Sequence, residues 1–123
     1  SLIKPQVREQ NFGKSDRRRA VNGASPNFIH SLDSAAMTLT INRCADEGIT
    51  DFAMVHDSYG VHASNVPSLY RLTRSAFVDM YIGNDVLKQF ADNALEVLDT
   101  VPLPPEKGDL DLSKVTNSKY FFA

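Results

Sequence analysis

Residues 52–62, FAMVHDSYGVH, restrict the fold most, because they interrupt a chain whose other segments have helical patterns. Four apolar residues lead into His56, Asp57 and Ser58, and a second short apolar run follows them. Short apolar runs on both sides of polar turn formers are typical of a β-hairpin, and Asp and Ser supply turn chemistry. We therefore expect two short strands joined by a tight turn.

Helical periodicity flanks this expected hairpin on both sides. From about Phe28 apolar residues recur at steps of three and four, and Gly48 is well placed to end this helix. A second helix can be capped by Ser64 or Asn65, with Pro67 tolerated in its first turn. The apolar stripes expected for the three helices are Ile29, Leu32, Ala36 and Leu39, then Val66, Leu69, Tyr70, Thr73, Ala76, Phe77, Met80 and Tyr81, then Leu87, Phe90, Ala91, Ala94, Leu95 and Leu98.

These elements predict an α+β fold, with helices packed around a short antiparallel β-hairpin. Residues 14–24 are typical of a short basic helix or turn ending near Gly23, and Pro26 with Asn27 separates it from the next helix. Three closely spaced prolines disfavour regular structure at the start of the tail. The expected parts are a basic N-terminal segment at 1–25, a body at 26–101 and a tail at 102–123.

Charge is distributed unevenly along the chain. Residues 1–23 hold six Lys/Arg against two Asp/Glu, whereas the remaining hundred residues hold seven against thirteen. A basic segment on an acidic body indicates local phosphate contact, with Arg17, Arg18 and Arg19 as candidates, and a solvated basic tail is the alternative. Cys44 is the only cysteine, and no apolar run approaches the about 20 residues of a membrane span. We therefore expect an intracellular protein with no disulfide framework and no membrane partner.

Asp57 is the candidate site residue with the clearest chemistry. A carboxylate between an apolar strand and a tight turn costs free energy unless a charged group meets it. Mg²⁺ would do so, since this ion takes one or two carboxylates, whereas a carboxylate that bonds its own turn is the structural alternative. A hydrolase triad of His56, Asp57 and Ser58 is disfavoured, because triad members usually come from separate segments. His30 alone in a helix is more commonly a packed residue, and nearby Asp33 is a candidate cap.

Three motifs resemble the single-subunit RNA polymerases of the bacteriophage and mitochondrial type. Residues 22–37, NGASPNFIHSLDSAAM, resemble the family's NG-x-x-PNF-[IV]-HS-x-D segment, which leads into a palm helix. Residues 52–60, FAMVHDSYG, resemble motif C, which is built around His-Asp-Ser or His-Asp-Cys. Residues 103–123, LPPEKGDLDLSKVTNSKYFFA, resemble the family's aromatic-rich terminus. The motifs occur in the family's order and near its spacing, and the resemblance covers residues 14–123.

This resemblance implies part of a right-hand polymerase fold. Residues 26–101 would form part of the palm with the motif C hairpin, and residues 102–123 the terminal extension called the foot. The complete enzyme would be a DNA-directed RNA polymerase that transfers ribonucleotides by a two-metal mechanism with Mg²⁺. Asp57 would be the second of its two metal-binding carboxylates, and His56 its catalytic neighbour.

The same resemblance implies roles for residues outside the turn. His30 matches a family histidine near the newest base pair, and Tyr59 is expected with it at the primer end. Phe122 and Ala123 match a tail that folds back towards the active site. The partners of the complete enzyme would be the DNA template, the RNA product and nucleoside triphosphates.

Several parts of the family's machinery would lie upstream of this sequence. They include the first metal aspartate, the motif B lysine and tyrosine, and the promoter-reading elements. We therefore expect the chain alone neither to polymerise nor to bind a promoter, and to need the missing upstream part of the polymerase. A truncation, a proteolytic fragment or one subunit of a split enzyme would fit, and the opening Ser1-Leu2-Ile3 without Met agrees with a cut inside a longer chain.

Ser58 distinguishes two branches of the resemblance. Related DNA polymerases carry His-Asp-Glu at motif C, so Ser58 favours the RNA polymerase branch. A fragment of a related DNA polymerase and a non-catalytic nucleic-acid-binding module remain the alternatives. The Tyr59-Gly60 pair favours a phage or prophage source and hence the host bacterial cytoplasm, with mitochondrion or plastid as the alternative.

Overall fold

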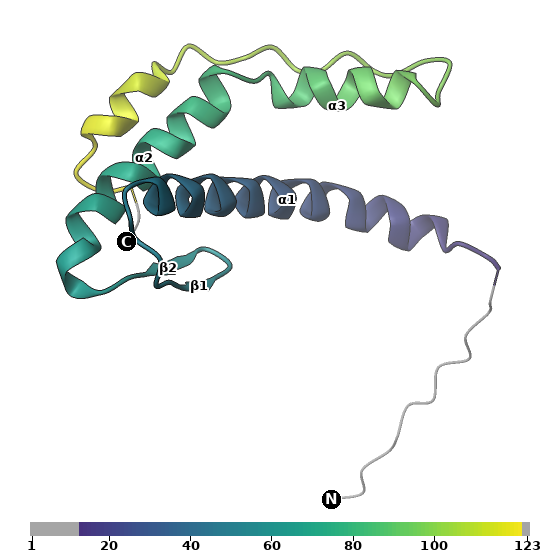
Figure 1. Ribbon diagram of the computed structural model, residues 1–123. Helices are drawn as coiled ribbons and strands as arrows, with labels where there is room; N and C mark the ends of the chain where they lie inside the picture. The colour runs from purple at the N-terminus through teal and green to yellow at the C-terminus, as the bar shows by residue number, and fades with distance from the viewer. Residues whose placement is uncertain (1–12, 122–123) are drawn as a thin grey trace, which may run out of the picture. The chain divides into compact units, whose positions relative to one another are not determined.

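The computed structural model describes residues 13–121, and most of them are helical. The elements run in the order α1 (Arg17–Asp46), β1 (Ala53–Val55), β2 (Ser58–Gly60), η1 (Ala63–Asn65), α2 (Val66–Ile82), α3 (Val86–Leu95) and η2 (Leu112–Asn117) (Figure 1). The two strands pair as an antiparallel hairpin, which confirms the predicted α+β class. Within residues 13–121 no helix has both the length and the apolar content needed to cross a membrane.

Helix α1 shows that the predicted break at Gly23 is wrong. The sequence predicted one helix or turn ending there and another starting near Phe28, but α1 continues from Arg17 to Asp46 with Pro26 inside it. A proline within a helix removes one hydrogen bond and crowds the carbonyl four residues earlier. Because the side chains around Pro26 are mostly exposed, water can bond the carbonyl that Pro26 leaves unpaired.

The chain divides within α1 into two compact units, Ser1–Ser31 and Leu32–Ala123. The described part of the first unit is the basic start of α1, whose side chains are largely exposed. The second unit contains the rest of α1, the hairpin, α2, α3 and η2. The two compact units differ from the functional parts predicted at 1–25, 26–101 and 102–123 and do not bear on them. Those parts stay a prediction.

The core of the second unit lies where the end of α1 meets α2 and the hairpin. Its buried cluster consists of Cys44, Ile49, Leu69 and Leu72, and the partly buried side chains packed against it are Phe52, Met54, Tyr59 and Val61. Gly48 ends α1 as predicted, because its φ of +83° turns the chain in a conformation that glycine adopts freely. The Ile49 amide then donates to the Cys44 carbonyl at 2.9 Å.

The apolar stripes predicted for all three helices are partly wrong. In α1, Ile29 and Leu39 are 52% and 38% exposed. Cys44, predicted on a neighbouring stripe with Ile41, is buried, and so is Thr40, which was not predicted.

In α2, Val66 and Tyr70 are each 49% exposed, although both were expected in the core. In α3, Phe90 and Leu95 are 57% and 50% exposed, and Leu98 lies beyond the end of the helix. Helical spacing identifies residues that share a face, but the elements packed against the helix determine which residues are covered.

Ion pairs join the end of α1 to α2. Arg43 donates from Nη2 to the Asp79 carboxylate at 2.6 Å and from Nη1 to the Ser75 hydroxyl at 2.9 Å. One helical turn along α2 from Ser75, Arg71 donates to the Glu47 carboxylate at 2.6 and 2.8 Å. These contacts position α2 beside the residues that lead into the hairpin.

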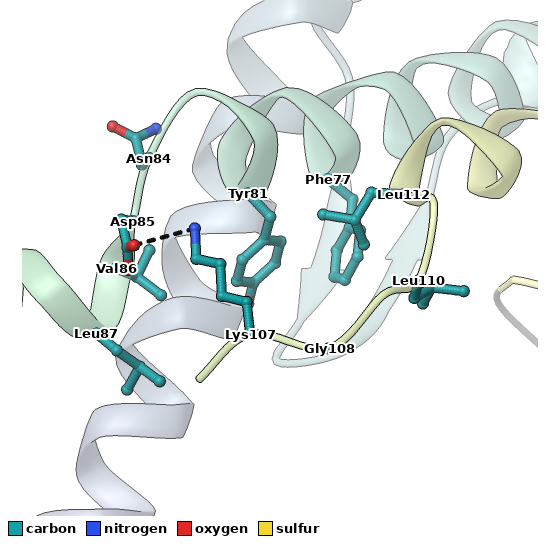
Figure 2. A pocket seen from close by; sticks show the side chains of 10 residues that line it. All are labelled: Phe77, Tyr81, Asn84, Asp85, Val86, Leu87, Lys107, Gly108, Leu110 and Leu112. Carbon is teal, nitrogen blue, oxygen red and sulfur yellow. Dashed lines mark ion pairs between the residues drawn. The ribbon is translucent and has the colours of Figure 1, made fainter. Parts of the chain in front are cut away.

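Residues 96–111, called the strap below, return the chain from α3 to η2 beside α2. Asp85 caps α3 by accepting from the Lys88 amide at 3.1 Å, and its carboxylate pairs with Lys107 at 3.1 Å. Figure 2 shows this ion pair beside a cavity of about 480 Å³ whose lining is mainly apolar, including Phe77, Tyr81, Leu110 and Leu112. Beyond the strap, η2 lies against α2, as the yellow segment beside α2 shows in Figure 1.

Candidate catalytic turn

Asp57 lies at the tip of the β1–β2 hairpin. Only His56 and Asp57 connect the strands, because Val55 pairs directly with Ser58. Ser58 therefore begins β2 and is not part of the turn, whereas the predicted strand–turn–strand order is confirmed. Since His56 and Asp57 are both turn residues, the alternation of side chains along a strand does not force them onto opposite faces.

His56 has a left-handed backbone conformation. Its φ is +51°, and it is the only non-glycine residue with positive φ within residues 13–121. A positive φ at the first position of a two-residue hairpin loop is characteristic of a type II′ turn, where glycine is usual. This conformation costs an L-residue roughly 1–2 kcal/mol. The backbone is therefore strained immediately before the candidate metal ligand, and such strain concentrates at functional sites.

The inner face of the hairpin holds this turn in place. Met54 and Tyr59 pair across the strands, and both pack against the buried cluster of the second unit. At Gly60 a Cβ atom would lie 3.1 Å from the Ala53 carbonyl oxygen and 3.3 Å from the Ala53 Cβ. The absence of a side chain at Gly60 thus permits the close approach of the two strands.

The Asp57 carboxylate is exposed and makes no hydrogen bond or ion pair within the described part of the chain. It therefore does not bond its own turn, as the structural alternative required. Across residues 13–121, no three His, Cys, Asp or Glu side chains gather as a metal-binding group. The carboxylate oxygens of Asp57 suit Mg²⁺, so the turn could donate one protein ligand to such an ion, and the other ligands would have to come from elsewhere.

Asp33 contributes to the electrostatics of the hairpin, a role that the sequence analysis missed. Burial is the main cause that raises the pKa of the Tyr59 hydroxyl, and the negative charges of Asp33 and Asp57 raise it further. The pKa of Tyr81 is also raised, first by burial and then by Asp33. The HS-x-D pattern contains Asp33 and could have indicated a role near the hairpin, but Asp33 was predicted only as a candidate helix cap.

The three arginines predicted as phosphate contacts form the exposed first turn of α1. The Asp16 carboxylate accepts a hydrogen bond from the Arg19 amide at 3.2 Å and pairs with the Arg19 guanidinium at 3.4 Å. Arg17 and Arg18 have no ion pair with any described residue. The predicted role of this cluster stays a prediction.

The remaining predicted site residues lie in different parts of the chain. His30 is exposed on α1 in the first unit, and its position at the primer end stays a prediction. Tyr59 is half-buried against the core, and this burial is the main cause that raises the pKa of its hydroxyl. Phe122 and Ala123 lie outside the described residues.

Comparison with known proteins identifies the family. The family model described as DNA-dependent RNA polymerase matches residues 3–101. The chain is 44% identical over 100 residues to DNA-directed RNA polymerase 3, chloroplastic, of Nicotiana sylvestris, covering 79% of this chain and 10% of that protein. It is 33% identical over 127 residues to the DNA-directed RNA polymerase of Enterobacteria phage T3, covering 98% of this chain and 14% of the phage protein. The chain belongs to the DNA-dependent RNA polymerase family, in its single-subunit phage and organellar type.

The relatives come from both organelles and phages. DNA-directed RNA polymerase 1, mitochondrial, of Arabidopsis thaliana is 40% identical over 108 residues, which cover 85% of this chain and 11% of that protein. The chain thus spans about a tenth of the length of the first relatives. Because both sources are represented, the predicted phage origin stays a prediction.

Proposed function

We propose that this chain supplies the metal-binding aspartate Asp57 to a DNA-directed RNA polymerase. The observation that carries the proposal is an exposed carboxylate, unpaired among residues 13–121, at the tip of a hairpin anchored on the core in a chain of this family. When bound, two Mg²⁺ ions would activate the RNA 3′-hydroxyl and stabilise the leaving pyrophosphate. The DNA template, the RNA product and nucleoside triphosphates would be the partners of the complete enzyme.

Each residue of the turn has a separate part in this proposal. Asp57 provides negative charge and oxygen donors on a hairpin whose inner face is packed, so its position is defined before substrate binds. His56 holds the strained backbone that sets the direction of Asp57 and lies next to it for contact with the primer end. The chain alone provides one carboxylate in this turn, so we expect it not to polymerise by itself.

The arginines at the start of α1 fit phosphate contact on electrostatic grounds. The N-terminus of a helix carries partial positive charge, which disfavours nearby cations such as Arg17 and Arg18. Nucleic-acid phosphates would compensate both the arginine charges and the helix dipole. We include these residues in the proposal as backbone contacts without sequence preference.

The test is Asp57→Asn in the polymerase that contains this chain. We expect nucleotide addition to fall by about 10²-fold or more, the scale of a lost charge-stabilising group, with promoter binding nearly unchanged. Single-turnover extension of an annealed primer measures the chemistry, and filter binding to promoter DNA measures the fold and the DNA contacts.

Asp51→Asn is the matched control for this experiment. Asp51 is also exposed and precedes the hairpin, but it lies 4.0 Å from His62 rather than in the turn. Its replacement should leave extension within about twofold of the wild type, as for other surface positions. Wild-type turnover in Asp57→Asn would rule out Asp57 as a metal ligand.

A further inference from the structure

Arg74, in the middle of α2, is a buried cation whose contacts with described residues are with neutral groups. The residue as a whole is only 3% exposed to solvent. Nη1 donates to the Tyr70 carbonyl at 3.0 Å, and Nε donates to the Ser118 carbonyl at 3.3 Å. The guanidinium carbon lies 3.3 Å from the centre of the Tyr70 ring and 5.5 Å from that of Phe121. These contacts orient the guanidinium but bring no negative charge to it.

Among residues 13–121, the third guanidinium nitrogen of Arg74 has no partner. Nη2 is buried without a hydrogen-bond acceptor from this part of the chain, and no ion pair of the described residues includes Arg74. By contrast, Arg71 and Arg43 each reach a carboxylate at 2.6 Å. Burial of a charge without a counter-ion is strongly disfavoured, so an acceptor with negative charge is expected at Nη2.

A cavity of about 290 Å³ lies beside this guanidinium. Arg74 and Asp57 both line it, together with Ser58, Tyr59, Tyr70 and Thr73. Its volume is close to the lower end of the range for small-ligand sites. An anion in this cavity would therefore lie between a buried cation and the candidate metal ligand.

We propose that this cavity is an oxyanion site in which Arg74 binds a phosphate group. A guanidinium presents fixed N–H donors that match phosphate oxygens and form strong charge-assisted hydrogen bonds. The Tyr70 ring covers the guanidinium and, like Arg74, lines the cavity. A shift of this ring, which would break its hydroxyl bond to the Ser118 carbonyl, would open Nη2 to the cavity. The choice of phosphate, as nucleotide or pyrophosphate product, rests on the proposed polymerase function, whereas the need for an anion rests on the burial of Arg74.

The test is titration of inorganic pyrophosphate into the full 123-residue chain without divalent metal, followed by calorimetry. We expect saturable binding that Arg74→Gln weakens by about tenfold or more, because a hydrogen bond to a charged group is lost. Arg71→Gln, one turn away and paired with Glu47, is the control and should change affinity by less than about twofold. Asp57→Asn should bind as tightly as the wild type or more tightly, since it removes a negative charge from the cavity wall.

Nitrogen-15 spectra of the arginine side chains of the wild type keep the test valid if Arg74→Gln fails to fold. Pyrophosphate should shift the Arg74 Nε signal and leave that of Arg71 in place. No binding by the folded wild type, equal binding by a folded Arg74→Gln variant, or a carboxylate of the protein found on Nη2 would overturn the inference. Those outcomes leave the role of Asp57 intact, whereas retained turnover in Asp57→Asn would refute only the metal site.

Discussion

At the scale of single residues, His56 connects backbone strain with the direction of Asp57. The side chain of His56 is exposed, so its packing gives little return for a φ of +51°. A glycine would adopt this conformation without steric cost. Histidine at this position therefore lowers the stability of the turn relative to glycine, which agrees with the proposed contact of His56 at the primer end.

His56→Gly should leave the free energy of unfolding of the chain unchanged or raise it by up to about 1 kcal/mol, because it relieves the left-handed strain. Urea denaturation followed by circular dichroism measures this change. In the polymerase that contains the chain, the same variant should slow nucleotide addition if the imidazole contacts the primer end.

His62→Gly is the matched control, and it should lower the free energy of unfolding rather than raise it. His62 is also exposed but has φ of −55°, which any residue adopts, so glycine there should cost about 0.5–1 kcal/mol in backbone entropy. A loss of more than about 1 kcal/mol in His56→Gly, or equal effects at both histidines, would contradict the strain at the turn.

At the scale of elements, Asp85 joins α3 to the strap through its charge. The Lys88 amide is the main cause that lowers the pKa of the Asp85 carboxyl, and the hydrogen bond from Lys107 is the next. A carboxyl whose pKa is lower in the folded state stabilises the fold above its unfolded pKa. This contribution is lost as the pH falls through the folded value.

The wild type should therefore have a higher free energy of unfolding than Asp85→Ala at neutral pH. This difference should shrink as the pH falls below about 4, near the ordinary carboxyl pKa. Urea denaturation between pH 2 and pH 7, a range set by that pKa, measures the difference. Lys107→Met is the control, since it removes the ion pair but keeps the hydrogen bond from the Lys88 amide to Asp85. It should therefore remove only part of the pH dependence of stability. Parallel pH profiles for wild type and Asp85→Ala would contradict the assignment.

At the scale of the whole second unit, the tail is docked on α2 before its last two residues. The Tyr70 hydroxyl donates to the Ser118 carbonyl at 3.1 Å, and the Phe121 and Phe77 rings lie 4.9 Å apart in an edge arrangement. Arg74 adds its own bond to the Ser118 carbonyl. These contacts join the described end of the tail, up to Phe121, to α2.

Deletion of Phe122 and Ala123 should therefore change the free energy of unfolding by less than about 0.5 kcal/mol, since the docking contacts remain. In the polymerase that contains this chain, the deletion should slow RNA synthesis, because the resemblance implies a tail near the active site. Elongation rate on a promoter template and denaturation of the same variant test both parts. Elongation at the wild-type rate would exclude a role of the tail in catalysis.

The hairpin turn that carries Asp57 could be predicted from the sequence because its signals are local. Two apolar runs and the polar pair His56-Asp57 lie within a few residues of each other, and the hairpin forms where they indicate. The continuity of α1 through Pro26 could not be predicted in the same way, because one lost hydrogen bond is tolerated where solvent can replace it. Asp33 and Arg74 were missed because their neighbours, Tyr59 and Ser118, lie far away in sequence.

The sequence by itself determined the α+β class, the hairpin with Asp57 in its turn and the family, since periodicity, turn chemistry and motif order are properties of the chain. Only the tertiary structure decided that Val66 and Tyr70 are exposed, and that Arg74 is buried beneath the Tyr70 ring beside the Asp57 cavity. The physical reason is that burial and charge pairing depend on which distant segments meet. Here the tail at Ser118 and Phe121 packs on α2 and encloses a cation for which the described residues provide no counter-ion.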